Sequence, residues 1–193
     1  MSNTIEYTTK ELMVAAVSRE LRDGELGFIG VGTDGRAFTL AVGIPMAAAR
    51  LAQMMHAPNF MIFWNNLLSP ELDQIPPKFT QDYLTRWPAA FQPVTTVDKC
   101  DMVARGQFDV SFDSAPQIDQ YGNLNITAIG DYRKPKVRLV GCLAQSDHFA
   151  FIKRPIIVTD MKKRTFVEKV DFITKMCIRD RPWAGWISSP IPI

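Results

Sequence analysis

The chain has 193 residues, of which 47% are hydrophobic and 22% charged, and its formal net charge is +2. This length is sufficient for one substantial hydrophobic core, and the composition is close to that of average globular proteins. A net charge this small gives no reason to expect binding to nucleic acid or to an anionic membrane. No run of about 18 apolar residues occurs, so the sequence indicates no membrane-spanning helix. Three scattered cysteines, Cys100, Cys142 and Cys177, form no CxxC pair, and we expect reduced thiols in a cytoplasmic protein.

The first half of the sequence predicts a helix and then a strand–helix–strand unit. Thr8 and Glu11 have capping-box spacing, and apolar residues then recur at helical intervals up to Gly24, a candidate C-cap. The strand, helix and strand that follow are expected at residues 27–31, 45–56 and 60–64. Pro45 suits the first turn of the helix, because its missing N–H leaves no hydrogen bond unmade there.

The second half is expected to be rich in strands. Runs of β-branched and aromatic residues, with little helical pattern between them, cover residues 108–112, 137–140, 155–159 and 165–170. Between the two halves, the proline-rich residues 69–93 are expected to form a long excursion with one short helix. We therefore predict the fold class α/β, with an open, largely parallel sheet flanked by helices.

A glycine pattern at residues 30–35 matches the GxGxxG motif of dinucleotide-binding turns. That motif needs a helix directly after it, so that a pyrophosphate meets the helix N-terminus. Residues 36–42 have the pattern of a strand instead. We therefore interpret the glycines as a turn and do not predict a dinucleotide site.

The two histidines suggest little chemistry. His56 lies at the predicted end of a helix, where a surface histidine compensates the helix dipole. Asp147 and His148 admit two interpretations, a base oriented by a carboxylate or an ordinary pair of loop residues, and only geometry separates them. No cluster of residues has the spacing of zinc ligands, so no metal site is predicted.

The most specific stretch is QIDQYGNLN at residues 117–125, followed by IGDY at residues 129–132. Gly122 and Asn123 predict a turn that tolerates positive φ, with Tyr121 and Asn125 as flanking structural residues. From physical reasoning alone, a structural turn after a buried strand is the leading interpretation of this block.

Over residues 7–174 the sequence resembles the β subunit of family I CoA-transferases of the glutaconate type. The blocks that carry the resemblance are YTTKEL at 7–12, AARLAQMMHAP within 47–58, QIDQYGNLNITAIGDY at 117–132, PKVRLVG at 135–141 and FVEKVDFIT at 166–174. The resemblance implies an open α/β fold, an α-type partner subunit and an acyl-CoA thioester as substrate, with no bound cofactor.

The resemblance also implies a catalytic position. In the family, a glutamate after the strand that follows Ala-Pro attacks the CoA thioester, forming an acyl anhydride and then a glutamyl-CoA thioester. Aligned on Ala57 and Pro58, that position holds Asn65, whose amide is a poor nucleophile. Asn65 is the candidate catalytic residue at this position, with an amide suited to position a water or a carbonyl group instead, and Asn66 is a candidate substrate contact. A simple turn after the strand is an equally weighted interpretation of the two asparagines.

A second departure concerns the glycine-rich loop that brings backbone amides close to the thioester in the family. Here the loop contains Gly141, Cys142, Leu143 and Ala144, with Leu143 and Ala144 at positions where glycines are expected. These four residues and Gln117 are the other candidate contacts to the substrate or CoA.

Two segments lie outside the family pattern. Residues 33–43 look like an insertion between the first strand and its helix. Residues 175–193 are expected to be a non-family tail, either the non-native end of a C-terminally truncated domain that covers residues 1–174 or a genuine divergent tail.

The function implied by the resemblance is transfer of CoA between an acyl-CoA and a carboxylate. Two alternatives stay open because of Asn65. The chain could belong to a hydrolase or ring-opening enzyme whose catalytic carboxylate lies on the partner, or it could be a non-catalytic subunit that only shapes the CoA site.

Overall fold

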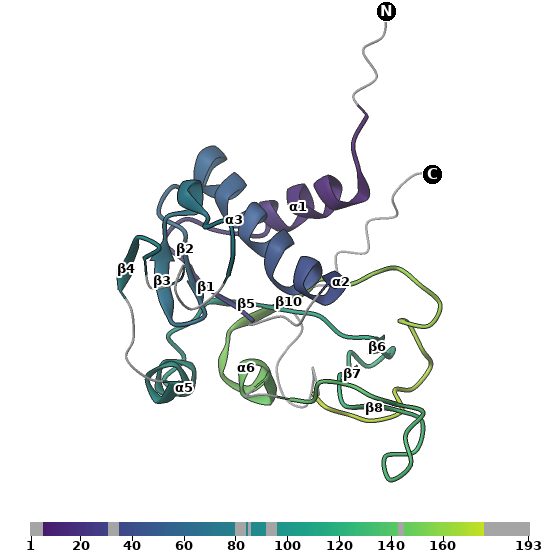
Figure 1. Ribbon diagram of the computed structural model, residues 1–193. Helices are drawn as coiled ribbons and strands as arrows, with labels where there is room; N and C mark the ends of the chain where they lie inside the picture. Colours follow the sequence, from purple (N-terminus) through teal and green to yellow (C-terminus); the bar gives the residue numbers. More distant parts are fainter. Residues whose placement is uncertain are drawn as a thin grey trace, which may run out of the picture.

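The structure, a computed structural model, describes residues 6–30, 35–79, 84, 86–91, 96–142 and 145–175. Its centre is a six-stranded sheet with the strand order β10-β5-β1-β2-β3-β4 (Figure 1). These strands are β1 Leu26–Ile29, β2 Met61–Trp64, β3 Leu67–Pro70, β4 Ala89–Phe91, β5 Val110–Asp113 and β10 Arg154–Ile157. The four strands from β10 to β2 are parallel, and β3 and β4 are antiparallel to their neighbours.

Helices cover both faces of the sheet (Figure 1). On one face α1 (Thr9–Arg19) lies beside α3 (Ile44–Met55), and on the other face lie α5 (Thr96–Ala104) and α6 (Gln145–Phe151). Successive strand residues point to opposite faces, so Ile62 and Trp64 pack in the core with α1 and α3, whereas Phe63 packs in the core with α5 and α6. The predicted fold class, an open and mostly parallel sheet flanked by helices, is confirmed.

The first helix begins as the sequence predicts. The Thr8 hydroxyl accepts a hydrogen bond from Glu11 N at 3.2 Å, and the Glu11 carboxylate accepts one from Thr8 N at 2.6 Å. The predicted C-cap at Gly24 is wrong, because the helix ends earlier with Glu20 as its C-cap. Gly24 has φ +76° and belongs to the turn before β1, where glycine tolerates the left-handed conformation.

The prediction of a strand at residues 36–42 is wrong. α2 (Gly35–Phe38), a π-helical turn η1 (Thr39–Gly43) and α3 form one continuous helix from Gly35 to Met55. In the wider turn, Ile44 N–H bonds to the carbonyl of Thr39, five residues back. Pro45, directly after it, has no N–H to offer and its ring would crowd a regular α-turn. The reason for dismissing the dinucleotide motif therefore fails, since a helix does follow β1.

This 21-residue helix is long and apolar enough to cross a membrane by length and composition alone. Its buried residues, among them Val42, Ala48 and Ala52, belong to the main core beneath α1 and above the sheet. A core helix that covers a sheet has the same composition, and this packing accounts for its apolar character.

The second half differs in part from the prediction. Helices α5 and α6 flank the later strands, although the sequence there shows little helical pattern. Residues 69–93 contain the expected short helix, η2 (Leu72–Gln74), but also the end of β3 and all of β4. The strand predicted at 165–170 is wrong, because Phe166 makes only an isolated bridge to Ile118.

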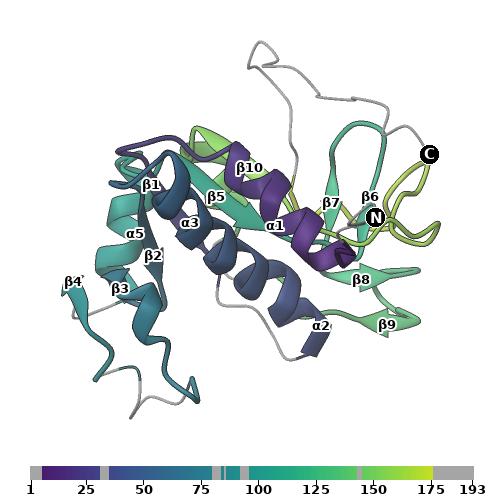
Figure 2. The same cartoon turned by 90° about the horizontal axis from the view of Figure 1, so that it is seen from above.

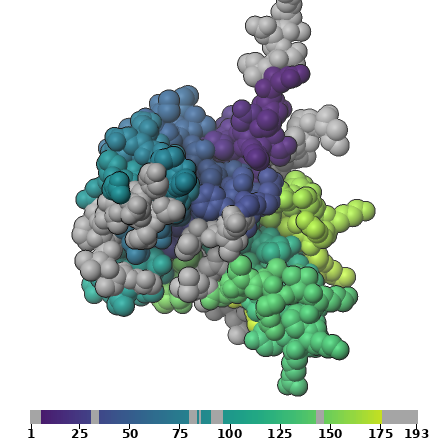
Figure 3. Space-filling model, viewed as in Figure 1, coloured from purple at the N-terminus to yellow at the C-terminus, as the bar shows by residue number. Residues whose placement is uncertain are grey.

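Two small antiparallel pairs extend beyond the carboxyl end of β5. They are β6 (Gln117–Ile118) with β7 (Leu124–Asn125), and β8 (Ala128–Ile129) with β9 (Val137–Arg138). In the space-filling view the green residues of this region form a lobe that stands out from the body of the molecule (Figure 3). We call residues 114–142 the arm.

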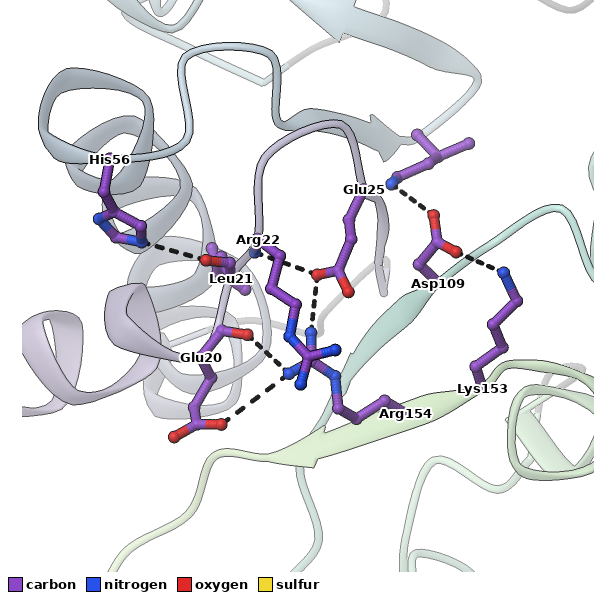
Figure 4. A network of polar contacts seen from close by, with 9 residues as sticks. Glu20, Leu21, Arg22, Glu25, His56, Asp109, Lys153 and Arg154 are labelled. Atoms are coloured by element: carbon purple, nitrogen blue, oxygen red, sulfur yellow. Dashed lines mark hydrogen bonds and ion pairs between the residues drawn. The ribbon is translucent and has the colours of Figure 1, made fainter. Parts of the chain in front are cut away.

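A polar network fixes the amino ends of the strands (Figure 4). The Arg154 guanidinium donates to the carbonyl of Glu20 and to the carboxylate of Glu25, both at 2.7 Å. The Asp109 carboxylate accepts from Leu26 N at 2.9 Å and pairs with Lys153 at 2.6 Å. Burial alone would raise the pKa of Asp109, but Lys153 and the Leu26 amide outweigh it and lower the pKa. This edge is occupied by structural contacts, which leaves the opposite edge for a site.

Candidate active site

The carboxyl ends of three parallel strands meet at one edge of the sheet. Ile29 of β1 is in register with Trp64 of β2 and with Phe112 of β5. Asn65 follows β2 directly at this edge, and Asp113 is the last residue of β5. Ligands of open α/β sheets bind beyond the carboxyl ends of the strands, so this edge is the candidate site.

Asn65 and Asn66 form the two-residue turn of the β2–β3 hairpin. Trp64 and Leu67 pair across it, and the asparagines have φ of 46° and 66°. Positive φ at both central residues is the requirement of a type I′ turn, and asparagine adopts it more easily than most residues. The turn interpretation therefore describes the backbone, while the catalytic role of Asn65 and the substrate contact of Asn66 stay predictions.

A buried charged cluster lies at the end of β5. The Asp113 carboxylate accepts hydrogen bonds from Lys175 Nζ and, at 3.2 Å, from Ser111 Oγ. The Asp113 and Lys175 side chains are 0% and 1% exposed. Burial would raise the pKa of Asp113, but His148 and Lys175 together outweigh it and hold the pKa below its ordinary value. Burial lowers the pKa of Lys175, against the opposing effects of Asp113 and Cys142.

His148 faces the same carboxylate. Its Nδ1 is buried without a hydrogen-bond partner and lies 3.8 Å from Asp113 Oδ1, and its ring packs on Phe28 with 4.3 Å between ring centroids. The interpretation that paired His148 with Asp147 is wrong, because Asp147 is exposed and adjacent residues of a helix do not face each other. The other interpretation, a pair of loop residues, is also wrong, since both belong to α6.

The predicted CoA loop reaches this cluster. Gly141 has φ +81°, and its N–H bonds to the carbonyl of Ile126 at 2.8 Å. Cys142 is exposed and lies close enough to Lys175 to affect its pKa. Leu143 and Ala144 lie outside the described residues. The structure thus places Cys142 in the neighbourhood of Lys175, the buried partner of Asp113.

The QIDQYGNLN block builds the base of the arm. The Asp119 carboxylate accepts hydrogen bonds from Tyr121 N and Asn123 N, both at 3.0 Å, around Gly122 with φ +76°. Asn125 donates to the side-chain oxygen of Gln117 at 2.7 Å.

Gln117 also donates to the Asp171 carboxylate at 3.0 Å, which ties the arm to the segment after β10. Its amide is occupied inside the protein, and its predicted contact with CoA stays a prediction. Among the described residues, no three His, Cys, Asp or Glu side chains are grouped so that they could hold a metal ion.

Neither Asp113 nor Lys175 was predicted from the sequence as a site residue. One local signal was available, because an acidic residue directly after the predicted strand at 108–112 is placed at a strand end. Its buried partner is 62 residues away, however, and no pattern within the sequence links the two positions.

No protein-family model matches the chain. The chain is 31% identical over 171 residues to the β subunit of 3-oxoadipate CoA-transferase from Pseudomonas knackmussii, covering 88% of this chain and 61% of that protein. It is 26% identical over 200 residues to the β subunit of glutaconate CoA-transferase from Acidaminococcus fermentans, covering 98% of this chain and 65% of that protein. The crystal structure of the decarboxylase AibA/AibB matches with a TM-score of 0.74 at 26% identity, covering 89% of this chain and 67% of that chain.

The sheet and its flanking helices have the fold of a glutaconate CoA-transferase crystal structure from Acidaminococcus fermentans, which matches with a TM-score of 0.71. The sequence is similar to the B subunits of two CoA-transferases, as the sequence blocks predicted. It spans 61% and 65% of the length of the two curated relatives.

Proposed function

We propose that the chain is the β-type subunit of a two-subunit, CoA-transferase-like enzyme that moves CoA between an acyl-CoA and a carboxylate. The similarity to the β subunit of 3-oxoadipate CoA-transferase, at 31% identity over 171 residues, is the observation that carries the proposal. The implied substrate is a CoA thioester, the implied partner is an α-type subunit, and no bound cofactor is required. We expect the complex to be cytoplasmic.

The geometry of the carboxyl edge supports this function. Asn65 stands in the hairpin turn where the resemblance implies the family glutamate, and the Gly141–Cys142 segment, which the resemblance implies near the thioester, lies close to the charged cluster of Asp113 and Lys175.

A second candidate function is favoured by Asn65 itself. An amide cannot form the acyl anhydride that transfer requires, so a carboxylate nucleophile would have to come from the partner. Hydrolysis or carbon–carbon cleavage of the thioester needs no such anhydride on this chain. AibA/AibB, whose fold is similar, is itself described as a decarboxylase.

The test uses this chain co-purified with its α-type partner. The complex is incubated with a panel of acyl-CoAs, with and without carboxylate acceptors, and free CoA and new CoA esters are followed by mass spectrometry. New esters that depend on an acceptor are the expected result. Free CoA or a shortened acyl chain without any acceptor would favour the second candidate, and a complex that does not bind CoA would overturn both.

A further inference from the structure

A groove lies along the helix α2–α3. Figure 2 shows α1 along one flank of α3 and the strand β3 on the other flank, where the groove is found. Its other wall is the segment after β3, residues 71–79, which we call the strap. The volume of the groove is about 390 Å³, within the range of about 300 to 1,000 Å³ that is usual for ligand pockets. The groove is lined by Phe38, Ala47 and Met54 of the helix and by Leu72, Ile75 and Phe79 of the strap, among other residues.

The groove presents apolar surface that the described chain leaves open. Met54 is 67% exposed, Ile75 48% and Phe79 38%. Arg50 is the one charged side chain among the described lining residues. Its Nε donates to Asp73 at 2.8 Å and its second nitrogen also pairs with that carboxylate. The groove therefore offers no unpaired cation to a ligand carboxylate, and burying a carboxylate there would be costly.

One end of the groove lies next to the candidate active site, separated from it by the buried ring of Trp64, which two lining rings contact edge to face. The ring of Phe79 lies 5.0 Å from that of Trp64, and the ring of Phe38 lies 6.4 Å from it. Trp64 directly precedes Asn65 in the hairpin, and its indole N–H donates to the carbonyl of Gly30 at the end of β1 at 3.0 Å. The groove thus begins one aromatic side chain away from the carboxyl edge.

We infer that this groove holds the acyl group of the thioester, so that the preferred substrates carry an extended apolar acyl group without a distal carboxylate. This rests on the proposed function and adds the substrate class. The two curated relatives are named for 3-oxoadipate and glutaconate, which are dicarboxylates. The paired state of Arg50 argues for a different acyl group in this chain.

The part of the helix before Ile44 contributes the inner end of the groove. Phe38 and Gly43 both belong to residues 33–43, the segment that looks like an insertion relative to the family. Arg36 anchors this segment through a two-pronged ion pair with Asp160, beyond β10, in which Nε lies 3.2 Å from the carboxylate. The insertion therefore adds a wall that distinguishes this acyl site from a pocket without it.

The first experiment measures acyl-CoA binding to the complex of this chain with its α-type partner. Calorimetric titrations compare CoA, butanoyl-CoA, octanoyl-CoA and glutaryl-CoA. Each buried methylene group raises affinity by up to about fourfold, so octanoyl-CoA should bind at least about tenfold more tightly than butanoyl-CoA. Glutaryl-CoA should bind no more tightly than butanoyl-CoA.

The second experiment fills the groove with a larger side chain. Ala47 is exposed on the groove wall, so Ala47→Trp should bring octanoyl-CoA binding down to the level of butanoyl-CoA while leaving CoA binding unchanged. Ala16→Trp, at an exposed alanine of α1, is the matched control and should change neither.

Equal binding of butanoyl-CoA and octanoyl-CoA, tighter binding of glutaryl-CoA than of butanoyl-CoA, or an unaltered octanoyl-CoA affinity in Ala47→Trp would overturn the inference while the proposed function stands. If CoA itself fails to bind, the proposed function falls and the inference with it.

Discussion

Asn65 adopts the positive φ that the hairpin turn needs, at the position where the resemblance implies the family nucleophile. Asn65→Gly should keep the free energy of unfolding within about 0.5 kcal/mol, since glycine adopts this conformation freely. Asn65→Val should lower it by about 1 to 3 kcal/mol, because a β-branched residue is strained there. Urea denaturation measures both.

The same pair of variants tests the side-chain amide. If the amide positions a carbonyl or a water, Asn65→Gly should lower turnover of the complex by at least about tenfold although the fold is intact. Unchanged turnover in Asn65→Gly would leave the residue with only its role in the turn.

Asp113 and Lys175 depend on each other because both are buried. Asp113→Asn leaves the Lys175 ammonium without a counter-charge, and we expect a loss of about 3 to 5 kcal/mol in the free energy of unfolding. The double variant Asp113→Asn with Lys175→Met removes both charges and should recover much of that loss. Denaturant titrations of the parent, of Asp113→Asn and of the double variant measure these free energies of unfolding. If Asp113→Asn is as stable as the parent, the ion pair is not formed.

At the scale of elements, the β6–β7 hairpin makes stability depend on pH. Burial would raise the pKa of Asp119, but hydrogen bonds from Asn123, Val170 and Tyr121 outweigh it and lower the pKa from its ordinary value of 3.8. Above 3.8 the stabilisation is fully present. As the pH falls below that value the unfolded chain binds protons first, and the stabilisation is lost down to the lowered pKa of the folded state.

Urea midpoints measured from pH 6 to pH 3 should therefore fall below about pH 4. Asp119→Ala should start from a lower midpoint and decline less steeply over this interval. An identical slope in the variant would mean that Asp119 does not carry this dependence.

The continuous helix from Gly35 to Met55 offers a stabilising substitution. Gly43 has helical φ and ψ of −62° and −49°, and a Cβ there would meet no atom within 4 Å. Gly43→Ala should therefore raise the free energy of unfolding by about 0.5 to 1 kcal/mol. Thermal and urea unfolding measure it, and a destabilised variant would contradict the conformation described for the π-helical turn.

The same helix explains where sequence reasoning failed. The segment from Ala37 to Val42 is a short, almost continuous apolar run that contains an aromatic and a β-branched residue, and the local pattern therefore favoured a strand. The segment is helical instead, because the π-helical turn places both Leu40 and Val42 in the core. A two-residue spacing of buried positions does not reveal an irregular helical turn.

At the scale of the whole molecule, the first half of the sheet follows from local signals. The capping box at Thr8, the apolar strands and the stop after His56 each act over a few residues, and the structure agrees with them. The sheet order and the Asp113–Lys175 pair depend on contacts between distant segments, which sequence periodicity does not encode. The resemblance implied a site at Asn65 and Gly141, which stays a prediction, and it did not predict the charged cluster of Asp113 and Lys175.

The central claim is that CoA binds at the carboxyl edge of this subunit, and hydrogen–deuterium exchange of the complex with and without saturating CoA tests it most directly. The account predicts slower amide exchange in the hairpin at residues 61–70 and in the loop at residues 137–142. Exchange at the amino edge, around Leu26 and Asp109, should not change. Protection confined to the amino edge, or absent from both predicted segments despite saturation with CoA, would contradict the claim.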